Sequence, residues 1–186
     1  MSYKRWIFIA IFLFGIGLVS GLTLGLAMPG GIADFLAEDL AALEQLSALL
    51  SPFQVSTAVF IFLKNTSALL LSFIFSPILC LLPILALMVN GWLLAFISVI
   101  VVEEESLGFV LAGLLPHGIF ELPALIIGEA AALSFGVTAM IALFKKKKRN
   151  QLLPSLKRNS RYLMIALALL LPAAILETYI TPLLLT

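Results

Sequence analysis

The chain contains one histidine, His117, and it precedes a glutamate, Glu121, by four residues. Residues four apart lie on the same face of a helix, so this spacing brings an imidazole and a carboxylate together. Such a pair can bind a cation, exchange a proton or take part in holding a metal ion. Pro116 is typical of the first position of a helix, which predicts that a helix begins there, with His117 in its first turn. Pro123 predicts a kink or a free carbonyl beside Glu121.

Other polar side chains interrupt apolar stretches of the sequence. Ionisable residues inside membrane spans are costly and are functional candidates by default. If a metal ion is bound, its expected ligands are His117, Glu121 and Glu129, although their spacing matches no standard zinc signature and the sequence defines no cofactor. Glu177 lies near a predicted span end and is better explained as a water-exposed residue. The candidate residues for ligand binding, ion binding or a proton relay are His117, Glu121, Glu129, Lys64, Asn65 and Asn90.

These candidates also have simpler explanations. Lys64 can extend its ammonium to the membrane surface or pair with a glutamate. Asn65 and Asn90 can form hydrogen bonds between helices that only hold the bundle together. No serine or cysteine nucleophile is convincingly placed beside His117, so we assign no catalytic residue and least favour an intramembrane hydrolase.

The composition is that of a membrane protein. The chain has 186 residues, of which 62% are hydrophobic and 11% charged, and its mean hydropathy is +1.19. Soluble domains carry about 25% charged residues, so an ordinary soluble enzyme, a disordered chain and a coiled coil are excluded. A span needs about 20 apolar residues, which allows five or six spans and no separate soluble domain. The single cysteine, Cys80, cannot form an internal disulfide.

We therefore expect an all-α polytopic bundle that forms one integral membrane domain over residues 1–186. An amphipathic interfacial helix is expected over 32–50, because apolar residues recur there at steps of three or four. The 38 residues from 107 to 144 are too long for one span and short for two. We therefore predict a re-entrant half-helix over 107–115 that precedes a full span. The five predicted spans cover residues 6–28, 55–75, 84–102, 116–144 and 162–185.

Basic residues set the expected orientation in the cytoplasmic membrane. Residues 145–161 hold eight of the eleven lysines and arginines, and Lys4 and Arg5 add two more. Lysine and arginine are enriched in cytoplasmic loops, so the N-terminus and the 145–161 loop are predicted to be cytoplasmic and the C-terminus outside. In that topology the polar candidates fall in the outer half or at the midplane of the membrane.

The run from Pro116 to Ala124 resembles the strongest motif of the stage II sporulation protein M family, Pro-His-Gly-x-x-Glu-x-Pro-Ala. Phe62–Thr66 and Val89–Gly91 resemble the asparagine motifs of its second and third spans, and Gly136 matches a family glycine. Position 129 is usually small in that family, so Glu129 departs from its pattern. The resemblance implies a multi-pass membrane protein of bacteria and archaea. In endospore formers it implies work with partner proteins in septal peptidoglycan remodelling.

Two functions remain open from the sequence. The first is an outer-half His/Glu site that binds or translocates an ion, a proton or a small polar ligand, as transporters do at broken helices. The second is a non-catalytic membrane scaffold or assembly partner in which the polar motif locks helix packing. The expected partners are the lipid bilayer, a second copy of the chain in a homodimer and other membrane proteins, but not nucleic acid. The dimer is favoured by small residues that permit close helix approach, namely Gly108, Gly113, Gly128 and Ala130–Ala132.

Overall fold

The structure is a computed structural model, and it describes residues 3–27, 51–78 and 80–185. All regular structure in these ranges is helical, and five helices are long and apolar enough to cross a membrane. The predicted all-α membrane fold is therefore confirmed, whereas the predicted amphipathic helix over 32–50 lies outside the described residues. The elements are α1 (Tyr3–Ala27), α3 (Val55–Phe75), α4 (Leu81–Glu104), α5 (Leu107–Phe144), the 3₁₀ helix η1 (Lys146–Gln151), α6 (Leu152–Tyr179) and α7 (Thr181–Leu184).

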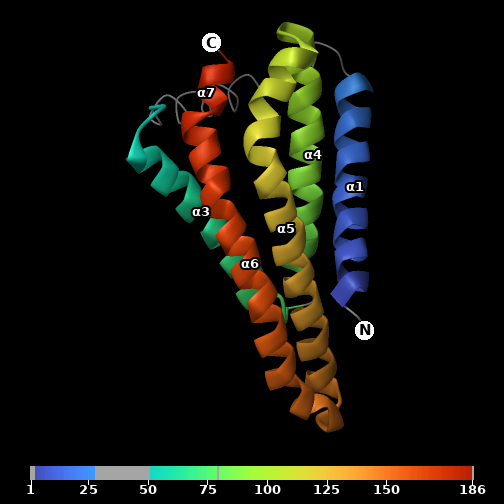
Figure 1. The fold of residues 1–186 in the computed structure, drawn as a ribbon. Helices are drawn as coiled ribbons and strands as arrows, with labels where there is room; N and C mark the ends of the chain where they lie inside the picture. Colours follow the sequence, from blue (N-terminus) through green and yellow to red (C-terminus); the bar gives the residue numbers. More distant parts are fainter. Residues whose placement is uncertain (1–2, 28–50, 79, 186) are drawn as a thin grey trace.

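The five long helices alternate in direction along the chain, as Figure 1 shows. One end of the bundle carries α7 and the turn between α4 and α5, and we call it the cavity end. The other end carries Lys145 and η1, and we call it the lysine end. The N-terminus of the chain points toward the lysine end and the C-terminus lies at the cavity end.

Helix α5 corrects the prediction of a re-entrant segment over 107–115. These residues form the first turns of one continuous helix of 38 residues, and both Pro116 and Pro123 lie inside it. Neighbouring helices let membrane helices tolerate internal prolines, so neither proline ends the helix. At about 1.5 Å per residue the helix is about 57 Å long, well beyond the roughly 30 Å hydrocarbon core. The extra length therefore extends α5 past the membrane core instead of folding back into it.

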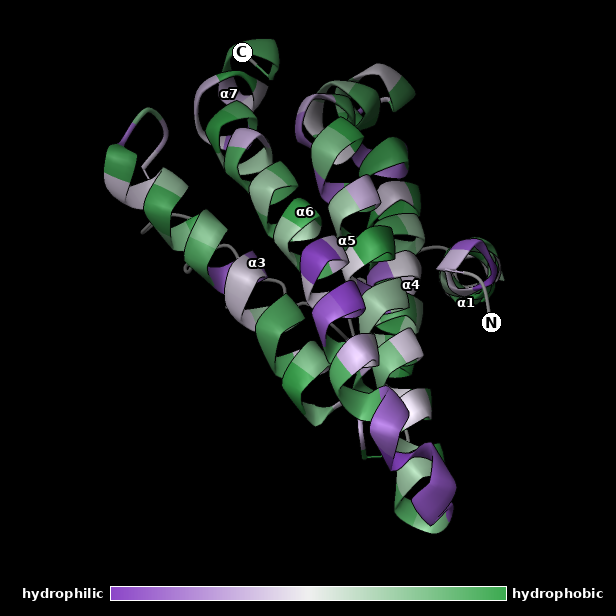
Figure 2. Cartoon of the chain, turned by 60° about the horizontal axis from the view of Figure 1, so that its bottom comes forward, coloured by the Kyte–Doolittle hydropathy of each residue, from purple (hydrophilic) through white to green (hydrophobic). Residues whose placement is uncertain are grey.

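Helix α6 accounts for part of the segment that was predicted as a loop. It begins at Leu152, ten residues before the predicted span, and runs on to Tyr179. Lys157, Arg158 and Arg161 consequently lie within its first turns. Together with the last turns of α5 these residues build a helical hairpin whose tip is η1. Figure 2 shows hydrophilic residues gathered at this tip, whereas α3 is largely hydrophobic along its length.

The buried apolar residues form two clusters on opposite sides of α5. Because α5 contributes to both clusters, it is the central helix of the bundle. The first joins α3, α5 and α6 through Leu69, Phe73, Ala124, Ala131, Ala132, Leu163, Ala166 and Leu170. The second joins α1, α4 and α5 through Trp6, Ala10, Phe14, Cys80, Leu87, Ala130 and Leu133.

Glycines bring α1 and α4 into backbone contact. A β-carbon on Gly17 would collide with the carbonyl oxygen of Met88, and one on Gly21 would collide with that of Trp92. From the other helix, a β-carbon on Gly91 would collide with the carbonyl oxygen of Phe14. Small residues allow such close approach of membrane helices, where packing rather than the hydrophobic effect drives association. We call this contact the α1–α4 seam.

Candidate functional site

Three acidic or imidazole side chains from two helices converge near the cavity end. The His117 Nε2 atom lies 3.9 Å from the Glu121 Oε2 atom, one helical turn further along α5. Glu177 of α6 completes the group, and one donor atom from each residue lies within 4.8 Å of the other two. We call these three residues the His–Glu cluster.

A partly open cavity of about 270 Å³ adjoins the cluster between α3, α5 and α6. Glu121 and Glu177 line it, and Lys64 and Asn65 of α3 face them. His117, Glu121 and Lys64 all act electrostatically on Glu177. The described residues that line the cavity are Pro52, Thr57, Phe60, Ile61, Lys64, Asn65, Glu121, Glu177, Thr178 and Pro182.

The His117 ring is held inside the bundle with one nitrogen unsatisfied. Its side chain is 16% exposed, against 32% for Glu121. The Nδ1 atom is buried and has no hydrogen-bond partner among residues 3–27, 51–78 and 80–185. Buried polar atoms normally have a partner, so this ring nitrogen is available for a further hydrogen bond.

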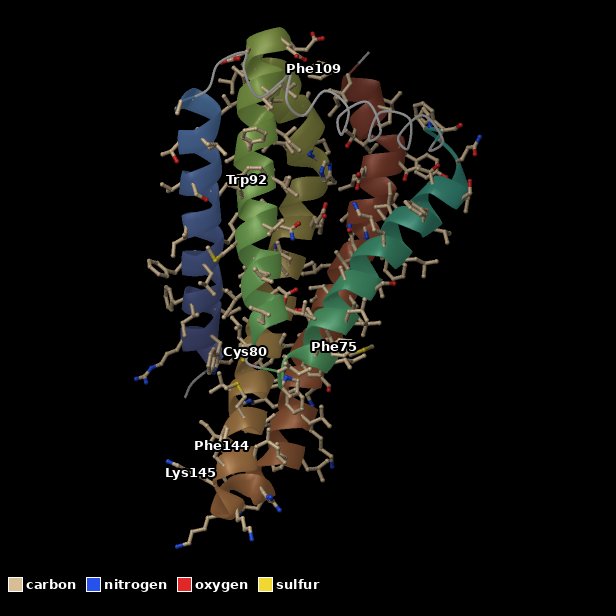
Figure 3. The ribbon with its side chains drawn as sticks, turned by 180° about the vertical axis from the view of Figure 1, so that it is seen from behind. Phe75, Cys80, Trp92, Phe109, Phe144 and Lys145 are labelled. Atoms are coloured by element: carbon tan, nitrogen blue, oxygen red, sulfur yellow. The ribbon has the colours of Figure 1, made fainter. Side chains whose placement is uncertain are left out.

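Helix register explains why these residues meet. His117 lies ten residues into α5 and Lys64 nine residues into α3, and both helices start at the cavity end. At about 1.5 Å per residue both side chains therefore lie about 14–15 Å from that end. Helix α6 runs in the opposite direction and ends at the cavity end, and Glu177 lies two residues before its last residue. Figure 3 shows how far α5 continues beyond this level, from Phe109 near one end to Phe144 and Lys145 at the other.

Asn65 links α3 directly to the cluster. Its Nδ2 atom donates a hydrogen bond of 3.2 Å to Glu121 Oε1. Glu121 thus uses one carboxylate oxygen toward α3 and the other toward His117. The amide fixes the orientation of the carboxylate without neutralising its charge.

Glu129 lies apart from the His–Glu cluster. It is 1% exposed and accepts a hydrogen bond from the Ser72 hydroxyl of α3. It does not line the cavity, and in the described part of the chain it joins no group of metal-ligating side chains. The structure therefore groups Glu177, rather than Glu129, with the two motif residues.

Asn90 is also separate from the site. Its side chain is exposed and donates a 2.7 Å hydrogen bond to the carbonyl of Ala86 in its own helix. The next residue, Gly91, is the one that packs against α1, because it lies at the α1–α4 seam.

Glu177 is the site residue that sequence reasoning undervalued. The sequence places it near the end of the last span, and it was interpreted as a water-exposed group. Its side chain is partly buried, borders the partly open cavity and lies close to His117 and Glu121 of α5. The available signal was its depth, because the same predicted topology put Glu177 and His117 near the same membrane face.

These features define the class of protein as a helical multi-pass membrane protein with a polar cavity near one end of its bundle. The family model for Stage II sporulation protein M matches residues 7–182, so the chain belongs to that family. It is 33% identical over 86 residues to an uncharacterized protein of the archaeon Methanocaldococcus jannaschii. That alignment covers 46% of this chain and 48% of the relative, so the chain spans about half the length of the curated relative it matches. No solved structure matches the chain.

Proposed function

We propose that this member of the stage II sporulation protein M family binds a small cation or polar ligand in the cavity between α3, α5 and α6. One observation carries the proposal: the His–Glu cluster borders a cavity that Lys64 and Asn65 line from a third helix. Polar groups that converge from several helices at membrane depth are typical of ligand and ion pathways.

Charge favours a bound cation. Glu121 and Glu177 bring two carboxylates to the cavity, and Lys64 brings one ammonium to the same wall. With His117 uncharged, the four side chains carry a net charge of −1. In a medium of low dielectric an uncompensated charge is costly, so a cation or a proton that balances it stabilises the folded site.

The orientation of the protein in the membrane is also part of this proposal. The basic residues of the lysine end favour a cytoplasmic position, which places the cavity end outside. The cavity then receives its ligand from the outer side of the cytoplasmic membrane, and movement of the ligand further along α5 would make the protein a translocator.

The proposal is tested by thiol labelling in a Cys80→Ala background. Ile61→Cys places a thiol on the cavity wall, and Leu63→Cys places one on the 54% exposed outward face of the same helix. A water-soluble, membrane-impermeant thiol reagent is expected to react with the first variant from outside intact cells and to react far more slowly with the second, which faces lipid.

Equal, slow labelling of both variants would show a dry, packed interior and would contradict the proposal. Labelling of Ile61→Cys from the cytoplasmic side only would reverse the orientation. Translocation is tested in proteoliposomes by flux of protons, sodium and zinc, in which His117→Ala is expected to abolish the flux of the transported ion without loss of the folded protein.

A second candidate function is that of a membrane scaffold, and one contact favours it. The hydrogen bond from Asn65 to Glu121 joins α3 to α5, as interhelical polar contacts that hold membrane bundles together do. A scaffold predicts that Glu121→Gln weakens assembly with a partner while no ligand is found. Co-purification from detergent extracts, with Glu129→Gln as the control, distinguishes the two functions.

A two-fold homodimer is also part of the proposal. Fewer of the small residues named from the sequence are available for the contact between copies than expected. Gly128 and Ala130–Ala132 are buried within the chain itself. Gly128 packs against Leu69 and Ala166. Among the described residues, a β-carbon on Gly108 would meet only the Ser106 hydroxyl at 3.8 Å, and one on Gly113 only a Leu185 methyl group at 3.8 Å, so both glycines remain available for a contact between copies. Chemical crosslinking in native membranes is expected to trap a dimer, and its absence would contradict this part.

A further inference from the structure

We propose that the His–Glu cluster is a binding site for one divalent transition-metal ion of the zinc type, held by His117, Glu121 and Glu177. This inference rests on the proposed function and names its ligand class. It differs from the ligand set expected from the sequence, because Glu177 of α6 takes the place of Glu129. The ion would link the two longest helices of the bundle, α5 and α6.

The donor atoms are close enough to share an ion. One from each residue lies within 4.8 Å of the others, and His117 Nε2 and Glu121 Oε2 are 3.9 Å apart. Zinc bonds to nitrogen and oxygen are about 2.0–2.2 Å long, so neighbouring tetrahedral ligands stand about 3.3–3.6 Å apart. Each glutamate has three rotatable side-chain bonds, so a rotation of its carboxylate would be enough to close a difference of about 1 Å.

The His117 ring has room for a further partner. Among the residues that the structure describes, its Nδ1 atom has no hydrogen-bond partner, and Nε2 faces Glu121 at 3.9 Å, beyond hydrogen-bond distance. An imidazole packed in this way gains a strong partner through either ring nitrogen when it ligates an ion. Nε2 is the ring nitrogen that faces the carboxylate of Glu121, so it is the atom placed to ligate an ion shared with the cluster.

The donor set selects the kind of ion. Imidazole nitrogen suits zinc, iron and their neighbours, whereas magnesium and calcium prefer oxygen ligands throughout. Three protein ligands leave a coordination position open, as in zinc sites that also bind a water or substrate. Because Glu121 and Glu177 line the cavity, that position faces the space beside Lys64, which suits an anionic or water ligand.

The test uses the tag-free full-length protein in detergent after removal of metals with a chelator. Titration with Co²⁺ is followed by its visible absorption, and titration with Zn²⁺ is followed by calorimetry. One ion per chain is expected to bind, and excess Mg²⁺ or Ca²⁺ should not displace it. His117→Ala should weaken binding by more than about 100-fold, since loss of an outer-shell partner alone costs 10–100-fold.

Glu177→Gln should weaken binding at least tenfold, and the matched control is Glu129→Gln, which alters a buried carboxyl outside the cluster and should bind as wild type does. If His117→Ala does not fold, His117→Gln and Glu177→Gln decide the question. Absence of saturable binding, wild-type binding by the folded cluster variants, or displacement by Mg²⁺ overturns the inference. If Ile61→Cys is labelled as expected but no metal binds, the metal site alone is rejected and the proposed function stands.

Discussion

The two sides of α5 are stabilised in different ways. On one side, the α1–α4 seam is closed by glycines whose backbones touch, and its buried cluster is apolar. On the other side, α3 and α6 meet α5 through an apolar cluster, through the buried hydrogen bond from Ser72 to Glu129, and through polar side chains at the cavity. The helix directions differ between the two sides as well. In Figure 1, α1 and α4 run nearly parallel, whereas α3 crosses the bundle at an angle.

This contrast indicates that the two sides of the bundle have different roles. The seam tolerates no added atom, so it supplies rigidity, while the α3–α5–α6 side carries the ionisable groups at a cost in stability. Functional sites commonly reduce stability in this way, and the remainder of the protein compensates. The predictions below test that difference, from the largest expected effect on stability to the smallest.

The strongest test changes the seam itself. Gly17→Ala places a methyl group against the carbonyl of Met88, which belongs to a neighbouring backbone and cannot rotate away. We expect the free energy of unfolding in detergent to fall by about 3 kcal/mol, as in overpacked cores. The matched control is Gly15→Ala in the same helix, where nothing lies within 4 Å, and it should be neutral or stabilising by up to about 1 kcal/mol. Equal effects of the two substitutions would show that the seam is loosely packed.

The buried pair of Ser72 and Glu129 gives the next largest effect. Ser72→Ala removes the hydroxyl that donates to the buried carboxyl, and a buried polar group left without its partner costs about 2 kcal/mol. The double variant Ser72→Ala/Glu129→Met should recover most of this loss, because it removes both polar groups together. Chemical unfolding gives the free energy of unfolding of the single and double variants. A double variant no more stable than Ser72→Ala would show that the Ser72–Glu129 hydrogen bond does not explain the loss.

The His–Glu cluster is expected to contribute little to stability. Glu177→Gln should change the free energy of unfolding by less than about 1 kcal/mol in metal-free buffer, because its side chain borders a cavity and is only partly buried. In the presence of Zn²⁺ the wild-type protein should melt at a higher temperature than this variant, since binding to the folded state stabilises it. Unfolding of Glu177→Gln without metal would instead assign the cluster a structural role.

Asn90 should have the smallest effect. Its side chain is exposed and donates its hydrogen bond within α4, so Asn90→Leu is expected to change the free energy of unfolding by less than about 0.5 kcal/mol. The adjacent substitution Gly91→Ala, which meets the carbonyl of Phe14, should be far more damaging. Comparable melting temperatures for Asn90→Leu and Gly91→Ala would contradict the conclusion that Gly91, and not Asn90, packs at the seam.

Much of the fold could be predicted from the sequence because long apolar runs are a strong physical signal. The span predicted over 55–75 coincides with α3, and the other spans are recognisable in α1, α4, α5 and α6. The prediction failed at 107–115, because the length of the stretch and Pro116 indicate a break that the continuous helix α5 does not have. A proline weakens a helix locally, but only tertiary packing decides whether the helix ends there. The early start of α6 was missed because its first turns are basic and resemble a loop.

The candidate site was predictable only in part. The pairing of His117 with Glu121 follows from their spacing within one helix. Which groups face them from α3 and α6 depends on helix rotation, and an apolar span gives little rotational signal because lipid and protein interior are both apolar. For that reason the sequence did not reveal that Asn65 donates a hydrogen bond to Glu121, or that Glu177 rather than Glu129 lies beside His117.

The most direct test is an experimental density map of the full-length protein in a lipid nanodisc, resolved around His117. The account predicts that the imidazole and the carboxylates of Glu121 and Glu177 converge within about 5 Å beside a hydrated space that Lys64 borders. A map in which Glu177 points away from α5, or in which packed hydrocarbon side chains fill that space, would contradict it.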